Sequence, residues 1–198
     1  MTQEIVIASK NKGKIREIRQ IYADLPVAIL ELPDLPDVVE DGSSFSENAR
    51  KKAVAIACHT EKWALADDSG LEVDALGGAP GIHSARWSGG GDEANNDRLL
   101  AELRDVPPPA RTARYRAVVV IASPGGRVVA EAEGSCEGLI GFQRRGSGGF
   151  GYDPLFILPQ HGRTMAELDP EAKNALSHRG LALRRLREPL TRALGPVR

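Results

Sequence analysis

Strand-like and helix-like spacings of hydrophobic residues follow one another along the first sixty positions. A short β-branched run covers residues 4–8, and apolar side chains then recur at helical spacing over residues 12–23. A second apolar run at residues 27–30 predicts another strand. The pattern Ser44-Phe45-Ser46-Glu47 has the form of a capping box and predicts a helix that begins there and ends near His59.

The middle of the chain contains short apolar runs separated by turn-forming residues. Residues 64–66 predict a small buried strand, and Asp67-Asp68-Ser69-Gly70 then predicts a turn, with strand resuming over residues 71–73. The glycine-rich stretch 77–91 predicts a loop without regular structure. Asp92 is expected to cap a helix over about residues 93–104, which ends before three consecutive prolines, Pro107-Pro108-Pro109. These prolines are the best candidate for a boundary between two lobes.

The last ninety residues predict a hairpin followed by helices. Residues 112–122 and 127–133 are strand-like and are separated by Pro124-Gly125-Gly126, which favours a tight connection between antiparallel strands. Another strand is expected at residues 155–158. Asp169-Pro170-Glu171 opens a short helix with proline at its first position, and leucines at helical spacing predict a final helix over about residues 177–194. Together the elements predict a mixed α/β fold.

Composition excludes several classes of protein. The chain has 198 residues, of which 41% are hydrophobic and 27% charged, as expected for a globular domain. Its 26 basic and 27 acidic residues give a formal charge of −1, so the overall balance favours neither a nucleic-acid polymer nor an anionic membrane as partner. Two isolated cysteines, Cys58 and Cys136, indicate a reducing cytoplasm rather than a disulfide framework. No apolar run approaches the roughly 18 residues that a membrane span needs.

A phosphate group is one expected ligand. The turn Ser9-Lys10-Asn11-Lys12-Gly13-Lys14 joins a strand to a helix, where free backbone amides and the positive end of the helix dipole attract anions. Its spacing is not that of a Walker A loop. The alternative is a solvated helix start that happens to carry lysines, although lysines at this end of a helix are unfavourable unless an anion compensates them.

Two acidic pairs from separate segments, Glu40-Asp41 and Asp67-Asp68, suggest a divalent cation. Mg²⁺ takes one or two carboxylates together with water and substrate phosphates, and Glu40 and Asp68 would satisfy that pattern. Because side chains alternate along a strand, only one of Asp67 and Asp68 is expected to point into a pocket. The alternatives are that the Asp67-Asp68 pair only caps a local turn, and that Asp41 rather than Glu40 is the ligand.

The C-terminal third offers groups for a purine base. Phe150-Gly151-Tyr152-Asp153 combines a flat ring, an open backbone and a carboxylate, and base stacking on an aromatic ring is worth roughly 1–3 kcal/mol. Lys173, His178 and Arg179 supply donors for the edge of a base. In the alternative interpretation Phe150 belongs to the core, and the donors are surface residues near a helix start.

Taken together, these motifs resemble the inosine/xanthosine triphosphate pyrophosphatase family over about residues 5–194. The similarity is carried by the lysine turn, Ser44-Phe45-x-Glu47-Asn48-Ala49, Asp67-Asp68-Ser69-Gly70, Gly77-Gly78-Ala79-Pro80-Gly81, Gly149-Phe150-Gly151-Tyr152-Asp153-Pro154 and Ser177-His178-Arg179-Gly180.

The resemblance implies a single domain over residues 1–198, elongated and two-lobed around a mixed sheet, with a central cleft and a second lobe over about residues 108–160. It also implies a cytoplasmic homodimer that uses Mg²⁺ to hydrolyse ITP, dITP or XTP to the monophosphate and pyrophosphate. By the same resemblance, Asp68 is the general base and, with Glu40, a metal ligand, while Lys52 is a further candidate for the triphosphate. The implied substrate-binding residues are Ser9, Lys10, Asn11, Lys12, Gly13, Lys14, Ser69, Phe150, Gly151, Tyr152, Asp153, Lys173, His178 and Arg179.

Two other functions are alternatives to the pyrophosphatase. A purine nucleotide sensor would bind the triphosphate without hydrolysing it and would not need Asp68. A phosphatase acting on modified pyrimidines or on monophosphates would release orthophosphate in place of pyrophosphate.

Because a 6-amino group cannot accept the hydrogen bonds that a 6-keto oxygen accepts, the pyrophosphatase is expected to prefer deaminated purines over ATP.

Overall fold

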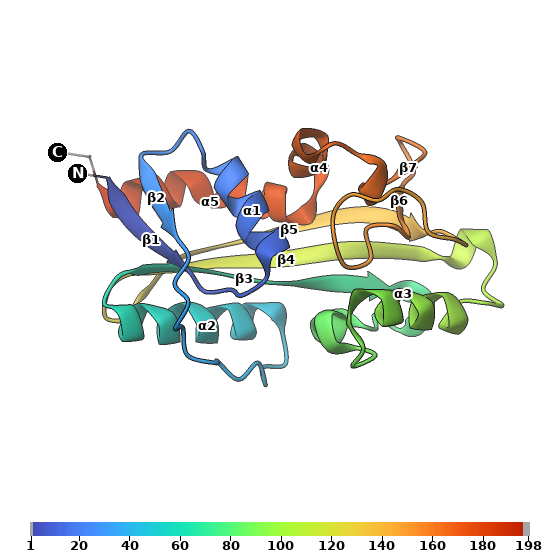
Figure 1. Ribbon diagram of the computed structural model, residues 1–198, viewed down its shortest axis with the longest axis horizontal. Coiled ribbons are helices and arrows are strands. Elements are labelled where there is room, and N and C mark those ends of the chain that lie inside the picture. Colours follow the sequence, from blue (N-terminus) through green and yellow to red (C-terminus); the bar gives the residue numbers. More distant parts are fainter. Residues whose placement is uncertain (1, 196–198) are drawn as a thin grey trace. The chain divides into compact units, whose positions relative to one another are not determined.

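A computed structural model describes residues 2–195 of the chain (Figure 1). Its α-helices lie close to the positions that the apolar periodicity predicts, and they are α1 (Lys12–Ile21), α2 (Phe45–Thr60), α3 (Gly91–Glu102), α4 (Pro170–Leu176) and α5 (His178–Leu194). The strands are β1 (Gln3–Ile7), β2 (Val27–Leu30), β3 (Trp63–Val73), β4 (Thr112–Ala122), β5 (Val128–Ile140), β6 (Phe156–Leu158) and β7 (Arg163–Thr164). Short 3₁₀ turns cover Asp74–Leu76, Gly81–Arg86, Pro108–Ala110 and Met165–Glu167.

The strands form a sheet in the order β2-β1-β3-β4-β5-β6-β7. β1 pairs in parallel with both β2 and β3, whereas β6 pairs antiparallel with both β5 and β7. The parallel part follows strand–helix–strand connections, and a short turn joins the antiparallel strands β6 and β7. The predicted mixed α/β class is therefore confirmed.

The chain divides into two compact units. The first comprises residues 1–68, 117–134 and 179–198, and the second comprises residues 69–116 and 135–178. β3, β4 and β5 contribute residues to both units. The three consecutive prolines lie inside the second unit rather than at its boundary, and the single-domain assignment with a lobe near residues 108–160 stays a prediction.

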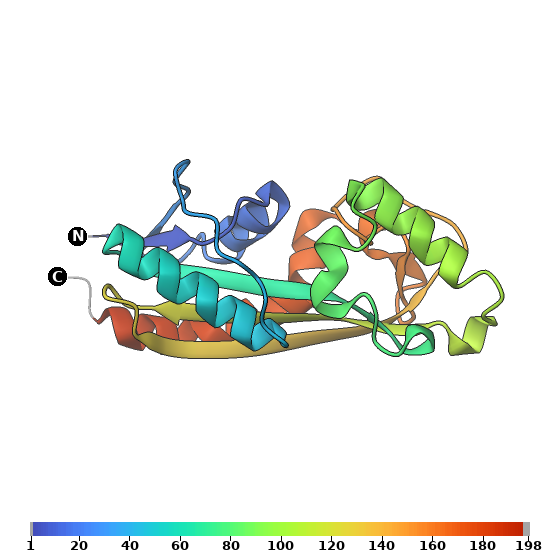
Figure 2. The same ribbon diagram turned by 90° about the horizontal axis from the view of Figure 1, so that it is seen from below.

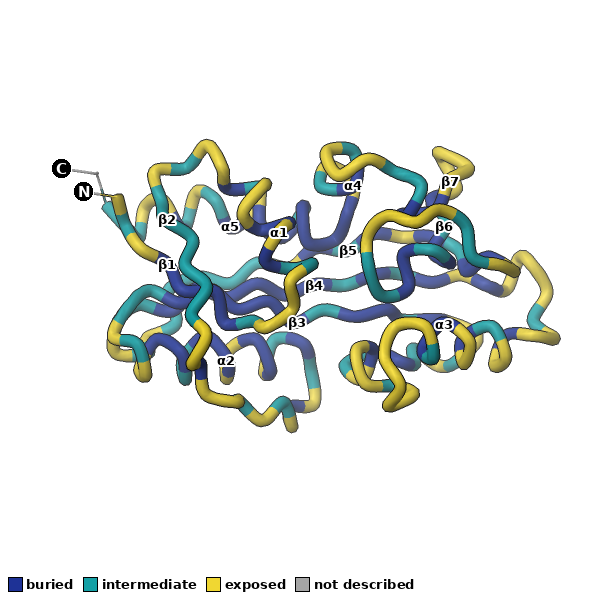
Figure 3. Tube along the Cα trace, in the orientation of Figure 1, coloured by how far each residue is buried: buried dark blue, intermediate teal, exposed yellow. Residues whose placement is uncertain are grey.

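The core of the first unit follows from the alternation of side chains along its strands. Ile5, Ile7 and Leu65 point to one face, where they join the apolar stripes of α1 and α5 in a buried cluster. The alternate residues Val6 and Ala64 are equally buried and point to the opposite face, where α2 lies (Figures 1 and 2). The sheet of this unit is thus covered on both faces, and Figure 3 shows β1, β3 and β4 as buried there.

The second unit has its own core. Leu99 of α3 and Leu103, the residue just after this helix, pack with Leu71 and Val73 of β3 and with the apolar residues around β6. Arg111 is 1% exposed and lies beside this core, where its guanidinium donates to the carbonyl oxygens of Leu103, Ile140 and Gly141.

Three local predictions were wrong. No turn interrupts residues 67–70, because β3 continues from Trp63 to Val73 through both aspartates. The predicted loop 77–91 contains the 3₁₀ turn Gly81–Arg86. α3 begins at Gly91 with no side-chain cap, so Asp92 lies inside its first turn and does not cap it.

Within residues 2–195, no helix combines the length and the apolar character that crossing a membrane requires.

Candidate functional site

The lysine turn lies between β1 and α1 and is ordered by its own polar side chains. Asn11 is the N-cap of α1, and its Oδ1 accepts the backbone N–H of Lys14 at 3.1 Å. The backbone N–H of Asn11 donates in turn to Oγ of Ser9 at 3.2 Å. The turn therefore follows the carboxyl end of a strand in the parallel part of the sheet, where ligands bind in open α/β sheets.

The three lysines of this turn have different surroundings. The Lys10 and Lys12 side chains are 63% and 76% exposed and pair with Asp37 and Glu31, carboxylates of the loop that follows β2. The Lys14 side chain is only 15% exposed, and its Nζ lies 2.5 Å from Oδ1 of Asp67. Burial lowers the pKa of Lys14 against the attraction of Asp67. Two lysines of the turn thus face solvent, whereas the third belongs to a buried ionic network.

Asp67 is the centre of that network. Nε of Arg179 donates to Oδ2 of Asp67 at 3.0 Å, and Nη1 of Arg179 donates to Oε2 of Glu17 at 2.5 Å. Burial alone would raise the pKa of Asp67, but the charges of Arg179 and Lys14 outweigh it and hold that pKa far below its usual range. Asp67 is therefore a fixed anion that anchors one lysine of the turn.

Asp68 points to the other face of β3 and meets a different cation. Its Oδ1 accepts from Nζ of Lys52 at 3.0 Å, and its Oδ2 accepts from Nδ2 of Asn48 at 3.3 Å. Burial raises the pKa of Asp68 above its usual range, and the charge of Lys52 offsets only part of that rise. An aspartate with a raised pKa is better matched to proton abstraction near neutral pH than an ordinary one.

Glu40 shares the Lys52 ammonium with Asp68. Its Oε1 lies 2.7 Å from Nζ of Lys52, so two carboxylates from distant segments converge on one cationic centre. Although burial opposes the charge of Lys52, the two carboxylates raise the pKa of that lysine. The neighbouring Asp41 is instead paired with Lys51. Of the two adjacent acids, Glu40 is the one that the fold brings to Asp68.

These oxygens fit a divalent ion that is shared with substrate. Glu40 and Asp68 already surround a position that holds a positive charge, and hard cations such as Mg²⁺ prefer carboxylate oxygens. Among residues 2–195 no group of three or more His, Cys, Asp or Glu side chains could hold a metal ion. Two carboxylates suit an ion that completes its coordination with water and phosphate oxygens.

The groups predicted for a base gather in the second unit, apart from Arg179. Oδ2 of Asp153 accepts from Nζ of Lys173 at 2.5 Å and from the backbone N–H of Phe150 at 2.8 Å. Nζ of Lys173 also lies 4.7 Å from the centre of the Phe150 ring, a cation–π arrangement. Phe150 is half-buried at this cluster.

Tyr115 completes this cluster. Its ring stacks on the His178 ring with centroids 4.6 Å apart and planes 11° apart, and its hydroxyl donates to Oδ1 of Asp153 at 3.4 Å. In the sequence, Tyr115 looks like any other buried residue of an alternating strand. Nothing in its local sequence identifies it as a site residue. Asn48 belongs to a motif of the resemblance but was given no role, and Glu17 was not singled out, because their partners Asp68 and Arg179 lie far away in the chain.

Other predicted residues have specific local roles. Gly151 has a φ of 61°, in the left-handed region that favours glycine, and Tyr152 is buried with its hydroxyl bonded to the carbonyl oxygen of Ser84 at 2.9 Å. Ser69 directly follows Asp68 in β3 and is half-buried. Arg179 was predicted at the edge of the base, and its guanidinium instead contacts Asp67 and Glu17. The role of each residue toward a nucleotide stays a prediction.

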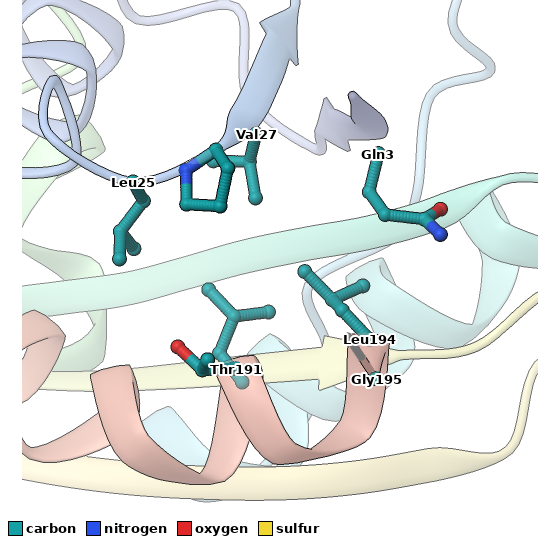
Figure 4. Close-up of a pocket in the computed structure, with 8 residues that line it drawn as sticks. Gln3, Leu25, Val27, Thr191, Leu194 and Gly195 are labelled. Carbon is teal, nitrogen blue, oxygen red and sulfur yellow. The ribbon is translucent and has the colours of Figure 1, made fainter. Parts of the chain in front are cut away.

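A small hollow in the first unit is unrelated to these residues (Figure 4). It is lined by Gln3 and Val27, at the amino ends of β1 and β2, and by Leu190, Thr191 and Leu194 near the end of α5. The lysine turn follows the opposite, carboxyl end of β1, and none of the candidate site residues lines the hollow. The hollow carries none of the charged groups that a phosphate or a metal ion would need.

Comparisons with known proteins agree with this arrangement. A model of the Ham1 family matches residues 5–189, and the chain belongs to that family. It is 52% identical over 194 residues to a dITP/XTP pyrophosphatase of Desulforamulus reducens, covering 96% of each chain. It is 53% identical over 191 residues to a dITP/XTP pyrophosphatase of Geobacter sulfurreducens, covering 94% of this chain and 96% of that protein.

A solved structure supports the same assignment. The structure of a HAM1 protein from Coxiella burnetii matches with a TM-score of 0.86 at 40% identity, covering 96% of this chain and 99% of that one. The family resemblance inferred from the sequence motifs is confirmed.

Proposed function

We propose that this protein hydrolyses non-standard purine nucleoside triphosphates, namely ITP, dITP and XTP, to the monophosphate and pyrophosphate. The relatives named dITP/XTP pyrophosphatase, with about half of their residues identical, support the reaction and the substrate class. The observation that carries the proposal is the position of Asp68. It is a buried carboxylate with a raised pKa that shares a cationic centre with Glu40 in the unit that carries the lysine turn.

The first unit would hold and activate the triphosphate. Lys10 and Lys12 are exposed and would exchange their present carboxylate partners for phosphate oxygens. Lys14, fixed by Asp67, adds a positive charge that also acts on Asp68. Asp68 would remove a proton from the attacking water, and Lys52 would stabilise the charge that develops on the phosphates.

A divalent ion belongs to this proposal, and Mg²⁺ is the one we propose. Glu40 and Asp68 would hold it, since both already contact one cationic centre. When bound, such an ion neutralises charge on the phosphates and acidifies a coordinated water.

The second unit would select the base. Phe150 would stack on the purine, and the donors Lys173 and His178 would face the 6-keto oxygen. Asp153 holds Lys173 and the backbone of Phe150, so the cluster keeps its shape without a ligand. A 6-amino group would leave those buried donors unpaired, which disfavours ATP.

Product analysis with dITP tests the proposal. With Mg²⁺ the protein should yield dIMP and pyrophosphate, and Asp68→Asn should lower kcat at least about a hundredfold, as expected for loss of a general base. The exposed Asp34→Asn is the matched control and should behave as wild type. Release of orthophosphate would indicate the phosphatase, and an Asp68→Asn variant as fast as wild type would remove Asp68 from the mechanism.

The alternative function is a nucleotide sensor that binds without hydrolysis. Binding of dITP with no product formed over hours would favour it.

We also propose that the protein acts as a homodimer in the cytoplasm. The cysteine usage supports that location, and size-exclusion chromatography with light scattering tests the assembly.

A further inference from the structure

We propose that Asp92 and Asn96 of α3 are positioning residues for the nucleobase, because they hold the backbone of Gly151, the residue that follows Phe150. The inference rests on the proposed function, since it gives Phe150 the task of stacking on the base. Neither residue belongs to the sequence motifs of the site. Both are assigned here from contacts within the second unit.

The contacts fix both backbone polar groups of Gly151, and so the two peptide units on either side of its Cα. Oδ2 of Asp92 accepts the backbone N–H of Gly151 at 2.7 Å, and Nδ2 of Asn96 donates to the carbonyl oxygen of Gly151 at 2.9 Å. The two residues are four positions apart, so they lie on one face of α3 and reach Gly151 together. We call this pair of contacts the α3 clamp.

Gly151 needs such support. Its φ of 61° lies in the left-handed region, and a Cβ added to it would meet nothing within 4 Å, so the space on that side of its backbone is open. The flanking residues are tied elsewhere, the Phe150 N–H to Asp153 and the Tyr152 hydroxyl to Ser84. The α3 clamp is therefore what fixes Gly151 between two anchored neighbours.

Asn96 is buried and bonded to its own helix. It is 1% exposed, and its Nδ2 also donates to the backbone carbonyl of Asp92 at 2.9 Å. Asp92 is exposed, so replacing its side chain removes a hydrogen bond without opening a cavity. The two halves of the clamp can thus be removed separately, one at the surface and one in the interior.

Loss of the clamp should weaken binding of the base and leave binding of the phosphates unchanged. An aromatic ring whose backbone moves loses part of the stacking energy that it contributes to binding of the base. The lysine turn belongs to the other unit and makes none of these contacts. In clamp variants the affinity for the base should therefore fall while the affinity for phosphate stays the same. A general loss of stability would not produce this difference.

The experiment compares Asp92→Ala and Asn96→Leu with wild type and with Glu93→Ala. Glu93 is the exposed neighbour of Asp92 and makes no contact with Gly151. The measurements are KM and kcat for dITP, and the inhibition constant of inorganic tripolyphosphate, which has no base. We expect KM to rise about tenfold in both clamp variants, with the inhibition constant within twofold of wild type and Glu93→Ala unchanged.

Several results would overturn the inference. A KM within twofold of wild type in a folded Asp92→Ala variant would do so, as would an inhibition constant that rises in parallel with KM. Should wild type fail to hydrolyse dITP, the proposed function fails, and calorimetric titration with dIMP and with tripolyphosphate then decides on the clamp. Weaker dIMP binding in the variants alone supports it, and equal or absent dIMP binding in all proteins overturns it.

Discussion

Asp67 and Asp68 are adjacent carboxylic acids whose ionisation the fold drives in opposite directions. Asp67 contacts Arg179 and Lys14, which outweigh its burial and lower its pKa. Asp68 contacts Lys52, whose charge is partly taken up by Glu40, so burial prevails and raises its pKa. Alternation along a strand thus separates a permanent anion from a group suited to accept a proton.

Replacing Asp67 tests the buried network. Asp67→Asn leaves Arg179 and Lys14 without their shared anion, and breaking a buried ion pair costs about 3–5 kcal/mol. We expect the free energy of unfolding at pH 7 to fall by about that amount in denaturant titrations. The exposed Asp34→Asn variant should stay within about 0.5 kcal/mol of wild type.

For the same variant we predict how its loss of stability depends on pH. A carboxyl group with a lowered folded-state pKa contributes stability that is fully present above its unfolded pKa of about 4 and is lost as pH falls toward the folded value. The difference between wild type and Asp67→Asn should therefore shrink as pH is lowered from 7 to 3. A difference that stays constant over this range would mean that the charge of Asp67 does not carry the effect.

At the scale of elements, the starts of α1, α2 and α4 were predictable because their chemistry is local. Asn11, Ser44 and Asp169 each accept a backbone N–H three residues later in the chain, as their residue types favour. The capping box at Ser44 is only half formed, since Glu47 accepts from the backbone N–H of Ser43 instead of Ser44. These signals place α1, α2 and α4 within a residue or two.

β3 shows why local chemistry was not enough. Asp67-Asp68-Ser69-Gly70 has the composition of a turn, yet it lies in a strand with neighbours on both sides, β1 and β4. The strand can bury two carboxylates because their cations come from residues 52 and 179. Such distant partners are invisible to rules that consider neighbouring residues, and the same holds for Tyr115 and the α3 clamp.

β5 and β6 approach each other closely at Gly138, and a substitution there tests this contact. A Cβ at this position would lie 2.5 Å from Cζ of Phe156 and 2.6 Å from the carbonyl oxygen of Ile157. Gly138→Ala should therefore lower the free energy of unfolding by about 1–3 kcal/mol, the usual cost of overpacking. Thermal or denaturant unfolding checks this, with Glu137→Ala as an exposed control on the same strand. An unchanged midpoint would mean that the two strands separate at little cost.

At the scale of the whole molecule, a formal charge of −1 conceals strong local fields. Lysines of the turn and of α2 each face a carboxylate of the segment 31–41 or of β3. These lysines and carboxylates all belong to the first unit, where each of the lysines lies beside an opposite charge. The sequence could locate the lysine turn and the acidic pairs, but not which lysine contacts which acid.

This balance predicts that the fold does not depend on a divalent ion. Lys52 already compensates Glu40 and Asp68, so removing the ion leaves no uncompensated pair of carboxylates. Dialysis against EDTA should abolish hydrolysis of dITP, with full recovery on adding Mg²⁺, while the midpoint of thermal unfolding falls only by the small amount that loss of a weakly bound ligand produces. A protein that unfolds in EDTA would show instead that the metal is structural. It would also show that the contact of Lys52 with the two acids cannot replace the ion.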